Sequence, residues 1–298
     1  MKNVKKVKHS GSDKRLEAIL IVIMLIVGLI MLYPLLVVLS TSFSSPGAVT
    51  SGKVWLFPVD FSLAGYRAVF RTNDVLIGYR NSLFYMIVGT AINLFMTLLA
   101  AYPLSRDDLA GQGILMKLFT FTMIFGGGMI PNYLLMKDLH LLNTVWVMLI
   151  PGAISVYNMI ITRTFIKTNI PKEMLEAAKI DGCSDIQYFF KIVLPLSGSV
   201  IAVIALYYAI GHWNTYFNAF MYLNDKELYP LQIFLKNILV SNQVEAELIV
   251  DEQVQAIEGI AEVLKYSLIV VAVVPVMIIY PFVQKHFVKG VMIGAVKG

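Results

Sequence analysis

The sequence predicts an all-α membrane protein with six transmembrane helices, and composition and patterning are the two observations that predict it. Of the 298 residues, 58% are hydrophobic and only 14% are charged, with a mean hydropathy of +0.73. A soluble domain carries about 25% charged residues. Runs of about 20 apolar residues mark transmembrane helices. Six such segments occur, at residues 17–42, 81–104, 118–136, 141–162, 192–223 and 266–284.

The first apolar segment follows the basic stretch "MKNVKKVKHSGSDKR" and is expected to remain in the membrane. It is longer than the apolar part of a signal peptide and lacks an obvious cleavage site. With the N-terminus inside, 16 of the 24 Lys and Arg residues fall on the cytoplasmic side. The positive-inside rule therefore predicts cytoplasmic tails at residues 1–16 and 285–298, flanking a membrane domain at 17–284.

Two outer segments are expected between the spans. Residues 44–80 alternate turn formers with aromatic residues, which is typical of ordered structure at a membrane interface. Residues 224–265 are acidic, yet their apolar residues recur near helical spacing. This pattern predicts at least one amphipathic helix running into the sixth span, with its acidic face turned to water or to a basic partner.

The third and fourth spans contain the stretches "FGGGMIPNY" and "IPGAISVYN". Small residues and prolines in such positions serve close helix packing, or they make the spans bendable. In the second case the helices would border a substrate path, and Asn132, Tyr157 and Asn158 would face it.

Catalytic, metal and phosphate-binding motifs are absent from the sequence. The four histidines show no catalytic or metal-ligand spacing, and Cys183 is the single cysteine. No Gly-rich phosphate loop with its Lys is present, so energy from ATP would have to come from another chain. The net charge of +5 reflects the basic cytoplasmic loops rather than nucleic-acid binding.

Residues 171–195 form a short polar module between the fourth and fifth spans. Pro171 suits a helix start, and "KEMLEAAKI" then predicts about two and a half helical turns. Gly182 is placed for a left-handed C-terminal cap, and Ser184 with Gln187 fits a capping box for a second helix. The module is either an interfacial amphipathic helix pair or a docking element for a partner.

The stretch "EAAKIDGCSDIQYFFKIVLP" resembles the EAA loop of permease subunits of bacterial ABC importers. The matching residues are Glu176, Ala177, Ala178, Asp181, Gly182, Phe189, Leu194 and Pro195. Cys183 departs from the pattern, which has a small residue there, usually Ala. The C-terminal stretch "KGVMIGAVKG" and residues 212–232 are similar to MalG-like permeases of carbohydrate importers.

The resemblance covers nearly the whole chain and implies a type I ABC importer permease architecture in a bacterial cytoplasmic membrane. It implies a second homologous permease, two cytoplasmic ATPase subunits that bind ATP and Mg, an extracytoplasmic sugar-binding protein and an oligosaccharide substrate. This chain would be non-catalytic, hold no cofactor and contact membrane lipid but no nucleic acid. The ATPases would be contacted by the EAA residues and by the tail residues Gly290, Gly294, Lys297 and Gly298.

For an oligosaccharide, aromatic rings and amides on the fifth span are suitable contacts. These residues are Tyr207, Tyr208, Trp213, Asn214 and Asn218. Trp and Tyr near a helix end are also common as interfacial belt residues.

The alternatives are a permease for a non-sugar solute, a secondary transporter and a membrane enzyme. A secondary transporter would need coupling charges inside the spans, and only His212 is ionisable there. A membrane enzyme would need the catalytic residues that the sequence lacks.

Overall fold

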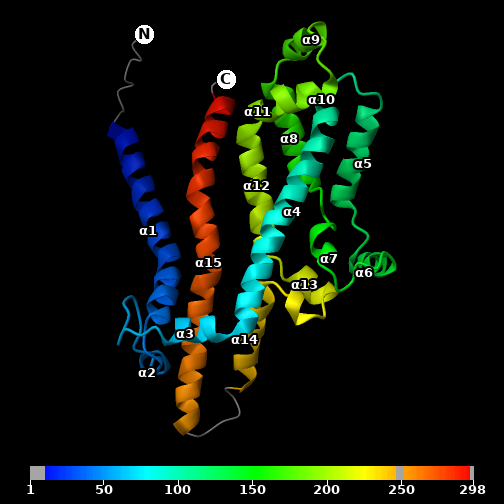
Figure 1. The fold of residues 1–298 in the computed structure, drawn as a ribbon. Helices are drawn as coiled ribbons and strands as arrows, with labels where there is room; N and C mark the ends of the chain where they lie inside the picture. The colour runs from blue at the N-terminus through cyan, green and yellow to red at the C-terminus, as the bar shows by residue number, and fades with distance from the viewer. Residues whose placement is uncertain (1–10, 246–251, 296–298) are drawn as a thin grey trace. The chain divides into compact units, whose positions relative to one another are not determined.

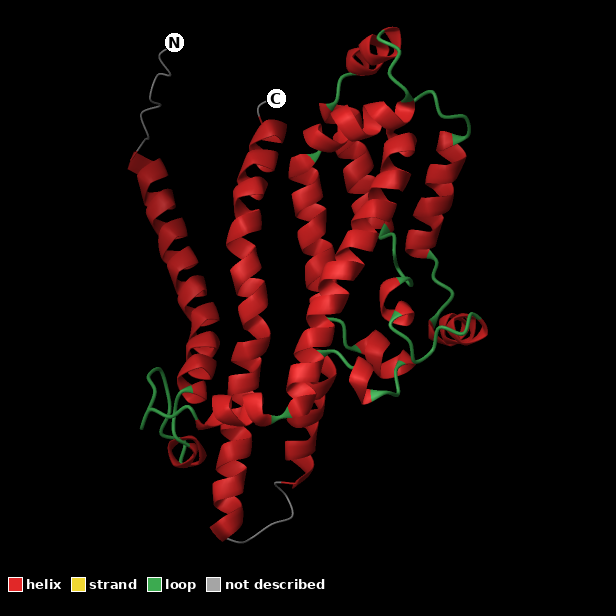
Figure 2. Cartoon of the chain, viewed as in Figure 1, coloured by secondary structure: helices red, strands yellow, loops and turns green. Residues whose placement is uncertain are grey.

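The computed structural model describes residues 11–245 and 252–295, and within these ranges the regular elements are helical (Figures 1 and 2). This confirms the predicted all-α class. In chain order the elements are α1 (Gly11–Ser42), α2 (Pro46–Thr50), α3 (Ala64–Arg71), α4 (Asn73–Ser105), α5 (Gln112–Ile124), α6 (Met129–Asp138), α7 (Trp146–Leu149), α8 (Val156–Asn169), α9 (Lys172–Ile180), α10 (Asp185–Tyr188), η1 (Phe189–Val193), α11 (Leu194–Leu196), α12 (Gly198–Trp213), α13 (Phe217–Tyr222), η2 (Lys226–Leu228), α14 (Leu231–Glu245) and α15 (Glu252–Ala295).

Helix length and hydropathy support three to five membrane spans among the described residues. Three helical stretches are long and apolar enough to cross a membrane alone: Arg15–Ser42, Asn73–Ser105 and Gly259–Ile278. Two bent pairs qualify only when each is counted as one span. The pair α5 and α6 is bent by 112°, and the segment Asp185–Leu196 is bent by 79° from α12. The count of six spans stays a prediction.

The third and fourth apolar segments are each divided between two helices at a glycine, which agrees with the bendable spans that the sequence left open. Gly128, between α5 and α6, has φ +85°, and Gly152, between α7 and α8, has φ +76°. A residue with a Cβ is strained in this left-handed region, so the helices end there. α8 has 14 residues, or about 21 Å of helix, which is shorter than a bilayer core of about 30 Å.

The predicted fifth span at 192–223 is likewise divided. A π-helical turn, η1, and the short α11 precede a bend at Ser197, after which α12 runs from Gly198 to Trp213. A separate short helix, α13, then begins at Phe217. The apolar run is continuous in sequence, but its straight helical part is only the 16 residues of α12.

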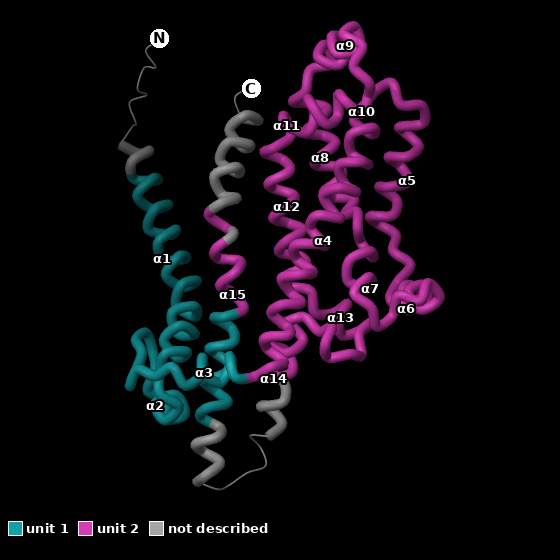
Figure 3. Tube along the Cα trace, viewed as in Figure 1, with its two compact units in different colours: residues 1–71, 239–271 teal, residues 72–238, 272–298 magenta. Residues whose placement is uncertain are grey.

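One of two compact units comprises residues 1–71 and 239–271 (Figure 3). Its α3 packs closely on α15, because a Cβ at Gly65 would lie 2.2 Å from Ser267 Oγ and 2.6 Å from Val263 Cγ1. Ser267 Oγ donates to the Ser42 carbonyl (3.3 Å) at the end of α1. Part of the predicted outer segment 44–80 is therefore ordered by these contacts.

The other unit comprises residues 72–238 and 272–298, and α4 is its central helix (Figure 3). α4 packs along α12 and α8. At the C-terminal end of α4, buried side chains from α4, α8, α9, α10 and η1 form one apolar cluster: Leu98, Ala101, Leu104, Met159, Ile166, Ile170, Ala178, Tyr188, Phe189 and Val193. This cluster seats the polar module on the membrane helices.

The helix predicted to run into the sixth span is confirmed, since α15 begins at Glu252 and continues through the whole apolar segment. α14 supplies a second helix in the region 224–265. Glu247 and Asp251, two of the acidic residues expected on this segment, lie outside the described residues.

Candidate functional site

The first candidate site is the helix pair α9–α10, which lies at the C-terminal end of α4 (Figure 1). Pro171 is the N-cap residue of α9, which covers the predicted residues Lys172–Ile180. Gly182 has φ +74°, and the Cys183 N–H donates to the Ala178 carbonyl (2.9 Å), which closes the C-terminal cap. The predicted helix, its end and its glycine cap are therefore confirmed.

α10 begins with the predicted capping box. The Gln187 N–H donates to Ser184 Oγ (3.3 Å), and the Ser184 N–H donates to Gln187 Oε1 (3.2 Å). Reciprocal bonds of this kind satisfy two backbone donors that a helix start leaves unpaired. The turn between the two helices is thus fixed from both sides.

The two alanines of the module lie in different environments. Ala178 is 7% exposed within the apolar cluster, whereas Ala177 is exposed. Glu176, Asp181 and Gly182 are also exposed. Ala178 therefore seats α9 on the chain's own helices, and the other four predicted residues remain on a surface available to a partner.

Two further surface residues of the module were not anticipated from the sequence. Ile180 is 86% exposed and Ile186 is 71% exposed, one on each side of the Gly182 turn. Their exposure adds apolar area to the surface of the module. The sequence signal that could have identified them is that both are large apolar residues in short polar helices, on the side away from the residues that pack into the apolar cluster.

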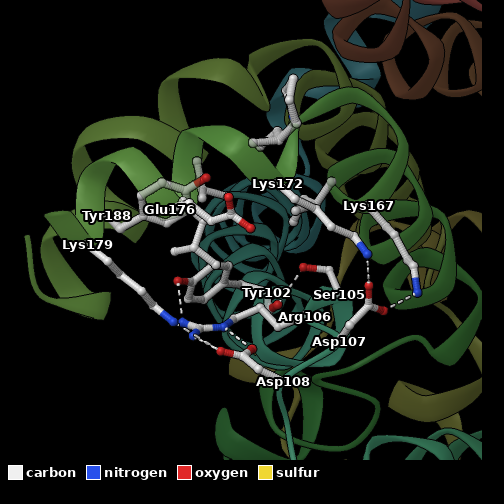
Figure 4. A pocket seen from close by; sticks show the side chains of 15 residues that line it. Tyr102, Ser105, Arg106, Asp107, Asp108, Lys167, Lys172, Glu176, Lys179 and Tyr188 are labelled. Atoms are coloured by element: carbon white, nitrogen blue, oxygen red, sulfur yellow. Dashed lines mark hydrogen bonds and ion pairs between the residues drawn. The ribbon is translucent and has the colours of Figure 1, made fainter.

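A charged cluster joins α9 to neighbouring elements and borders a cavity of about 260 Å³ (Figure 4). We define this cluster by its seven ion-paired residues: Arg106, Asp107, Asp108, Lys167, Lys172, Lys179 and Asp185. Asp107 pairs with Lys172 and with Lys167 (Nζ–Oδ1 2.6 Å). The connection α4–α5, which supplies Arg106, Asp107 and Asp108, is thereby joined to the polar module.

The other half of the cluster centres on Arg106. Its guanidinium donates to both carboxylate oxygens of Asp108 (2.8 and 2.5 Å), to Tyr102 Oη (3.2 Å) and to Asp185. Asp108 also pairs with Lys179 (3.3 Å). Arg106 is only 15% exposed at its side chain, so it is the most enclosed charge among these pairs.

The ion pairs shift the pKa values of Asp107, Asp108 and Lys172 in the directions that favour the charged forms. The hydrogen bonds from Lys167 and then Lys172 lower the pKa of Asp107 to about 2. The Arg106 guanidinium holds the pKa of Asp108 well below its usual range, and Asp107 raises the pKa of Lys172. Asp107, Asp108 and Lys172 are therefore charged at neutral pH.

The second candidate site is a polar cavity of about 300 Å³ between α4, α8, α12 and the turn before α8. Four of the residues predicted to face a substrate path line it: Asn158, Tyr207, Tyr208 and Asn218. Asn158 is 5% exposed, and its hydrogen bonds within the described residues use its backbone N–H and carbonyl, not its side-chain amide. Tyr207 is 47% exposed. These two side chains are thus available to a bound molecule.

Other polar residues of this cavity are used by the protein itself. The Asn93 amide donates to the carbonyls of Gly152 (3.0 Å) and Ala153 (2.9 Å), which leaves its oxygen to accept from His212 Nε2 (2.6 Å). Tyr208 Oη accepts from the Ser155 N–H (3.0 Å) and bonds to Thr97 Oγ1 (2.6 Å). These bonds connect α4, α12 and the turn before α8.

The remaining predicted path residues do not line the cavity. Asn132, Tyr157 and Asn214 are exposed elsewhere. Trp213 is 1% exposed, and its indole N–H donates to the Ala272 carbonyl (2.9 Å). The expectation that Trp213 faces a path is therefore corrected: its ring packs α12 against α15.

Within the described ranges, no group of three or more His, Cys, Asp or Glu side chains is arranged to hold a metal ion. Of the predicted tail contacts, Gly290 and Gly294 belong to α15. Lys297 and Gly298 lie outside the described residues.

Comparison with known proteins gives one consistent result. The model of the family described as "Binding-protein-dependent transport system inner membrane component" matches residues 75–293. The chain is 44% identical over 276 residues to the polygalacturonan/rhamnogalacturonan transport system permease protein YtcP of Bacillus subtilis, covering 92% of this chain and 96% of that one. It is 41% identical to Protein LplC of the same organism, with 91% of each chain covered.

Among solved structures, the chain is similar to one in a bacterial ABC transporter involved in the import of the acidic polysaccharide alginate. The TM-score is 0.85 at 35% identity, and the match covers 95% of this chain and 100% of that chain. The fold is therefore that of a type I ABC importer permease. With its long apolar helices, the chain is a multi-pass protein of the cytoplasmic membrane, and it belongs to the family of binding-protein-dependent transport system inner membrane components.

Proposed function

We propose that this permease moves oligosaccharide fragments of acidic polysaccharides into a bacterial cell. The observation that carries the substrate class is the 44% identity to a polygalacturonan/rhamnogalacturonan permease over 92% of the chain. The similarity to a chain of an alginate importer, also an acidic polysaccharide transporter, supports the same class. The chain would work with a second permease of related fold and an extracytoplasmic sugar-binding protein.

ATP hydrolysis is assigned to two cytoplasmic ATPase subunits, which would bind ATP and Mg and dock on the α9–α10 module. Glu176, Ala177, Asp181 and Gly182 form the exposed part of this proposed contact, and Ile180 adds apolar area. Glu176 can accept hydrogen bonds, while Ala177 permits close approach. The caps at Gly182 and Ser184 stiffen the module, so a displacement by the ATPases would move it as one body.

The polar cavity is the proposed glycan contact of this chain. Tyr207 offers an aromatic face for the apolar side of a sugar ring, and the free Asn158 amide can both donate to and accept from hydroxyl groups. Asn218 is exposed at the same cavity. A site lined by amides and phenols suits the hydroxyls that all glycans share.

The membrane topology is proposed to have six spans, with both termini, the α4–α5 connection and the α9–α10 module in the cytoplasm. The distribution of Lys and Arg supports this orientation. The proposed domain boundaries are a basic tail at 1–16, a membrane domain at 17–284 with its coupling module at 171–195, and a C-terminal tail at 285–298. Outer segments would cover 44–80 and 224–265.

The decisive experiment is reconstitution of the complete transporter in vesicles, followed by measurement of glycan uptake and ATP hydrolysis. Oligogalacturonides should stimulate ATP hydrolysis through the cognate binding protein, and the neutral trisaccharide raffinose should not. Stimulation by raffinose alone would overturn the acidic substrate class while leaving the ATP-driven importer intact.

The docking role is tested in the same vesicles with Glu176→Lys. Reversal of an interface charge costs roughly 2 kcal/mol or more, about 30-fold in affinity for the ATPases. The matched control is Glu17→Lys, which reverses an exposed charge on α1 outside the module. Normal ATPase retention and uptake with Glu176→Lys would overturn the assignment of α9 as the docking element.

A further inference from the structure

We propose that Arg106, Asp107 and Asp108, which follow α4 directly, are positioning residues that make α4 move together with α9 and α10 during transport. This inference rests on the proposed function, in which the module receives the motion of the ATPases. The covalent connections of the module lead only to α8 and, through η1, to α12. The charged cluster adds a non-covalent connection to α4, the central helix of the unit.

The three residues contact both helices of the module, and Figure 4 shows the contacts of Asp107 and Asp108 with α9. Asp107 binds Lys172, the first residue of α9, and Asp108 binds Lys179, one residue before the end of α9. These two attachment points lie seven residues apart, or about 10 Å along the helix axis. A helix held at both ends cannot pivot about a single contact, so a displacement of α9 is transmitted as a displacement of the α4–α5 connection.

The second helix of the module is held by the same connection. Arg106 pairs with Asp185, the first residue of α10. Its guanidinium is fixed at the same time by Asp108 and by the Tyr102 hydroxyl, which belongs to α4. Arg106 therefore links the start of α10 to the last turn of α4 through one enclosed side chain.

The C-terminal end of α4 is itself anchored to the neighbouring helices. The Leu104 carbonyl accepts hydrogen bonds from Arg163 Nε of α8 (2.7 Å) and from Gln112 Nε2 of α5 (2.7 Å). Further along α4, Asn93 and Thr97 bond to His212 and Tyr208 of α12 at the polar cavity. α4 thus runs without interruption from the charged cluster to the cavity proposed to contact the glycan.

The charge balance of this region excludes a simple anion-binding role for its cavity. Its four cationic side chains, Arg106, Lys167, Lys172 and Lys179, face four acidic ones among the residues that the structure describes here: Asp107, Asp108, Glu176 and Asp185. The cations are already paired with carboxylates, so a phosphate or lipid headgroup would have to displace an existing partner. A mechanical connection accounts for the same contacts without an additional ligand.

The test is the double variant Asp107→Asn/Asp108→Asn in the reconstituted transporter, with oligogalacturonides as the probe. These substitutions keep side-chain size but remove the charges that hold Lys167, Lys172 and Lys179. Exposed ion pairs contribute little to folding stability, so the complex should assemble at the wild-type level. We expect the amount of glycan imported per ATP hydrolysed to fall about fivefold or more, the usual lower range of coupling between sites.

Two controls make the result specific. Asp138→Asn at the end of α6 removes an exposed carboxylate outside the cluster and should leave the ratio unchanged. Asp107→Glu keeps the charge and should retain most of the coupling. An assembled double variant that imports as much glycan per ATP as the wild type would overturn the proposal.

If the double variant fails to assemble, the single variants Asp107→Asn and Asp108→Asn test the proposal instead, because each leaves one end of α9 attached. A reduced import ratio in either supports the connection, and wild-type ratios in both overturn it. These outcomes can be distinguished from failure of the proposed function. In that case the wild-type complex itself would show no stimulation of ATP hydrolysis by oligogalacturonides.

Discussion

Replacing Gly89 by Ala should weaken the packing of α12 on α4 at the polar cavity. Gly89 is buried on α4 and faces the His212 ring. A Cβ there would lie 2.4 Å from both Cε1 and Nε2 of His212 and 2.8 Å from Nδ1. The ring cannot simply rotate away, because its Nε2 is bonded to Asn93 Oδ1 at 2.6 Å.

The expected loss of stability combines three terms. Overpacking of a filled interface costs about 1 to 3 kcal/mol. Loss of the His212–Asn93 hydrogen bond adds about 0.6 kcal/mol, the average for interhelical bonds in membrane proteins. The gain in helix propensity from Gly to Ala offsets about 1 kcal/mol. The net destabilisation should therefore be about 0.6 to 2.6 kcal/mol.

Gly211→Ala is the matched control, because it lies on α12 next to His212 and a Cβ there meets no atom within 4 Å. The assay is thermal unfolding of the detergent-solubilised complex, followed by loss of the monodisperse peak in size-exclusion chromatography. We expect a lower midpoint for Gly89→Ala and no decrease for Gly211→Ala. Equal unfolding midpoints for the two variants would show that His212 is not packed closely against Gly89 of α4.

Three further predictions concern single features of the structure. Trp213→Phe keeps an aromatic ring but removes the donor to the Ala272 carbonyl, so the same unfolding assay should show a loss of about 1 kcal/mol without a change in glycan selectivity; an altered selectivity would return Trp213 to the substrate path. Gly182→Val should lower ATPase retention far more than Gly182→Asn, because the left-handed conformation costs a β-branched residue about 1 to 2 kcal/mol and Asn much less; equal retention would mean that the turn is not needed in this form. The pKa of Asp107 is lowered from 3.8 to about 2, so its paired, charged form is fully present above pH 3.8 and is lost only as the pH falls through the folded-state pKa. The ratio of the Asp107→Asn transport rate to the wild-type rate should therefore stay constant from about pH 5 to about pH 8. Convergence of the two rates near pH 5 would show that Asp107 is not held in its charged form.

Local signals in the sequence predicted the α9–α10 module well. Its helix limits, the glycine cap and the capping box depend on residues within a few positions of one another, and the structure has all three. Hydropathy also located the apolar segments. It did not reveal where they break, because hydropathy averages over a window and does not register backbone conformation at Gly128 or Gly152.

The charged cluster could not be predicted from the sequence, because its partners are far apart along the chain. Asp107 and Lys167 are 60 positions apart, and Arg106 and Asp185 are 79 apart. Each residue, taken alone, is an ordinary charged residue outside the six apolar segments. The prediction that Trp213 faces a substrate path was wrong for a related reason. Its position near a helix end is typical of an interfacial or path-facing residue, but tertiary packing against α15 buries it.

The helix break before α8 explains why polar residues gather at the cavity and which of them remain free for a substrate. A turn within an apolar segment leaves backbone groups unpaired, and each costs several kcal/mol in an apolar surrounding unless a partner is provided. Asn93 supplies donors to the carbonyls of Gly152 and Ala153, and the Tyr208 hydroxyl accepts from the Ser155 N–H. These side chains are therefore committed to the backbone of the turn, and their removal should destabilise the permease whichever substrate is present. Asn158 and Tyr207 have no such commitment among the described residues, so their substitution should change transport of the glycan before it changes stability.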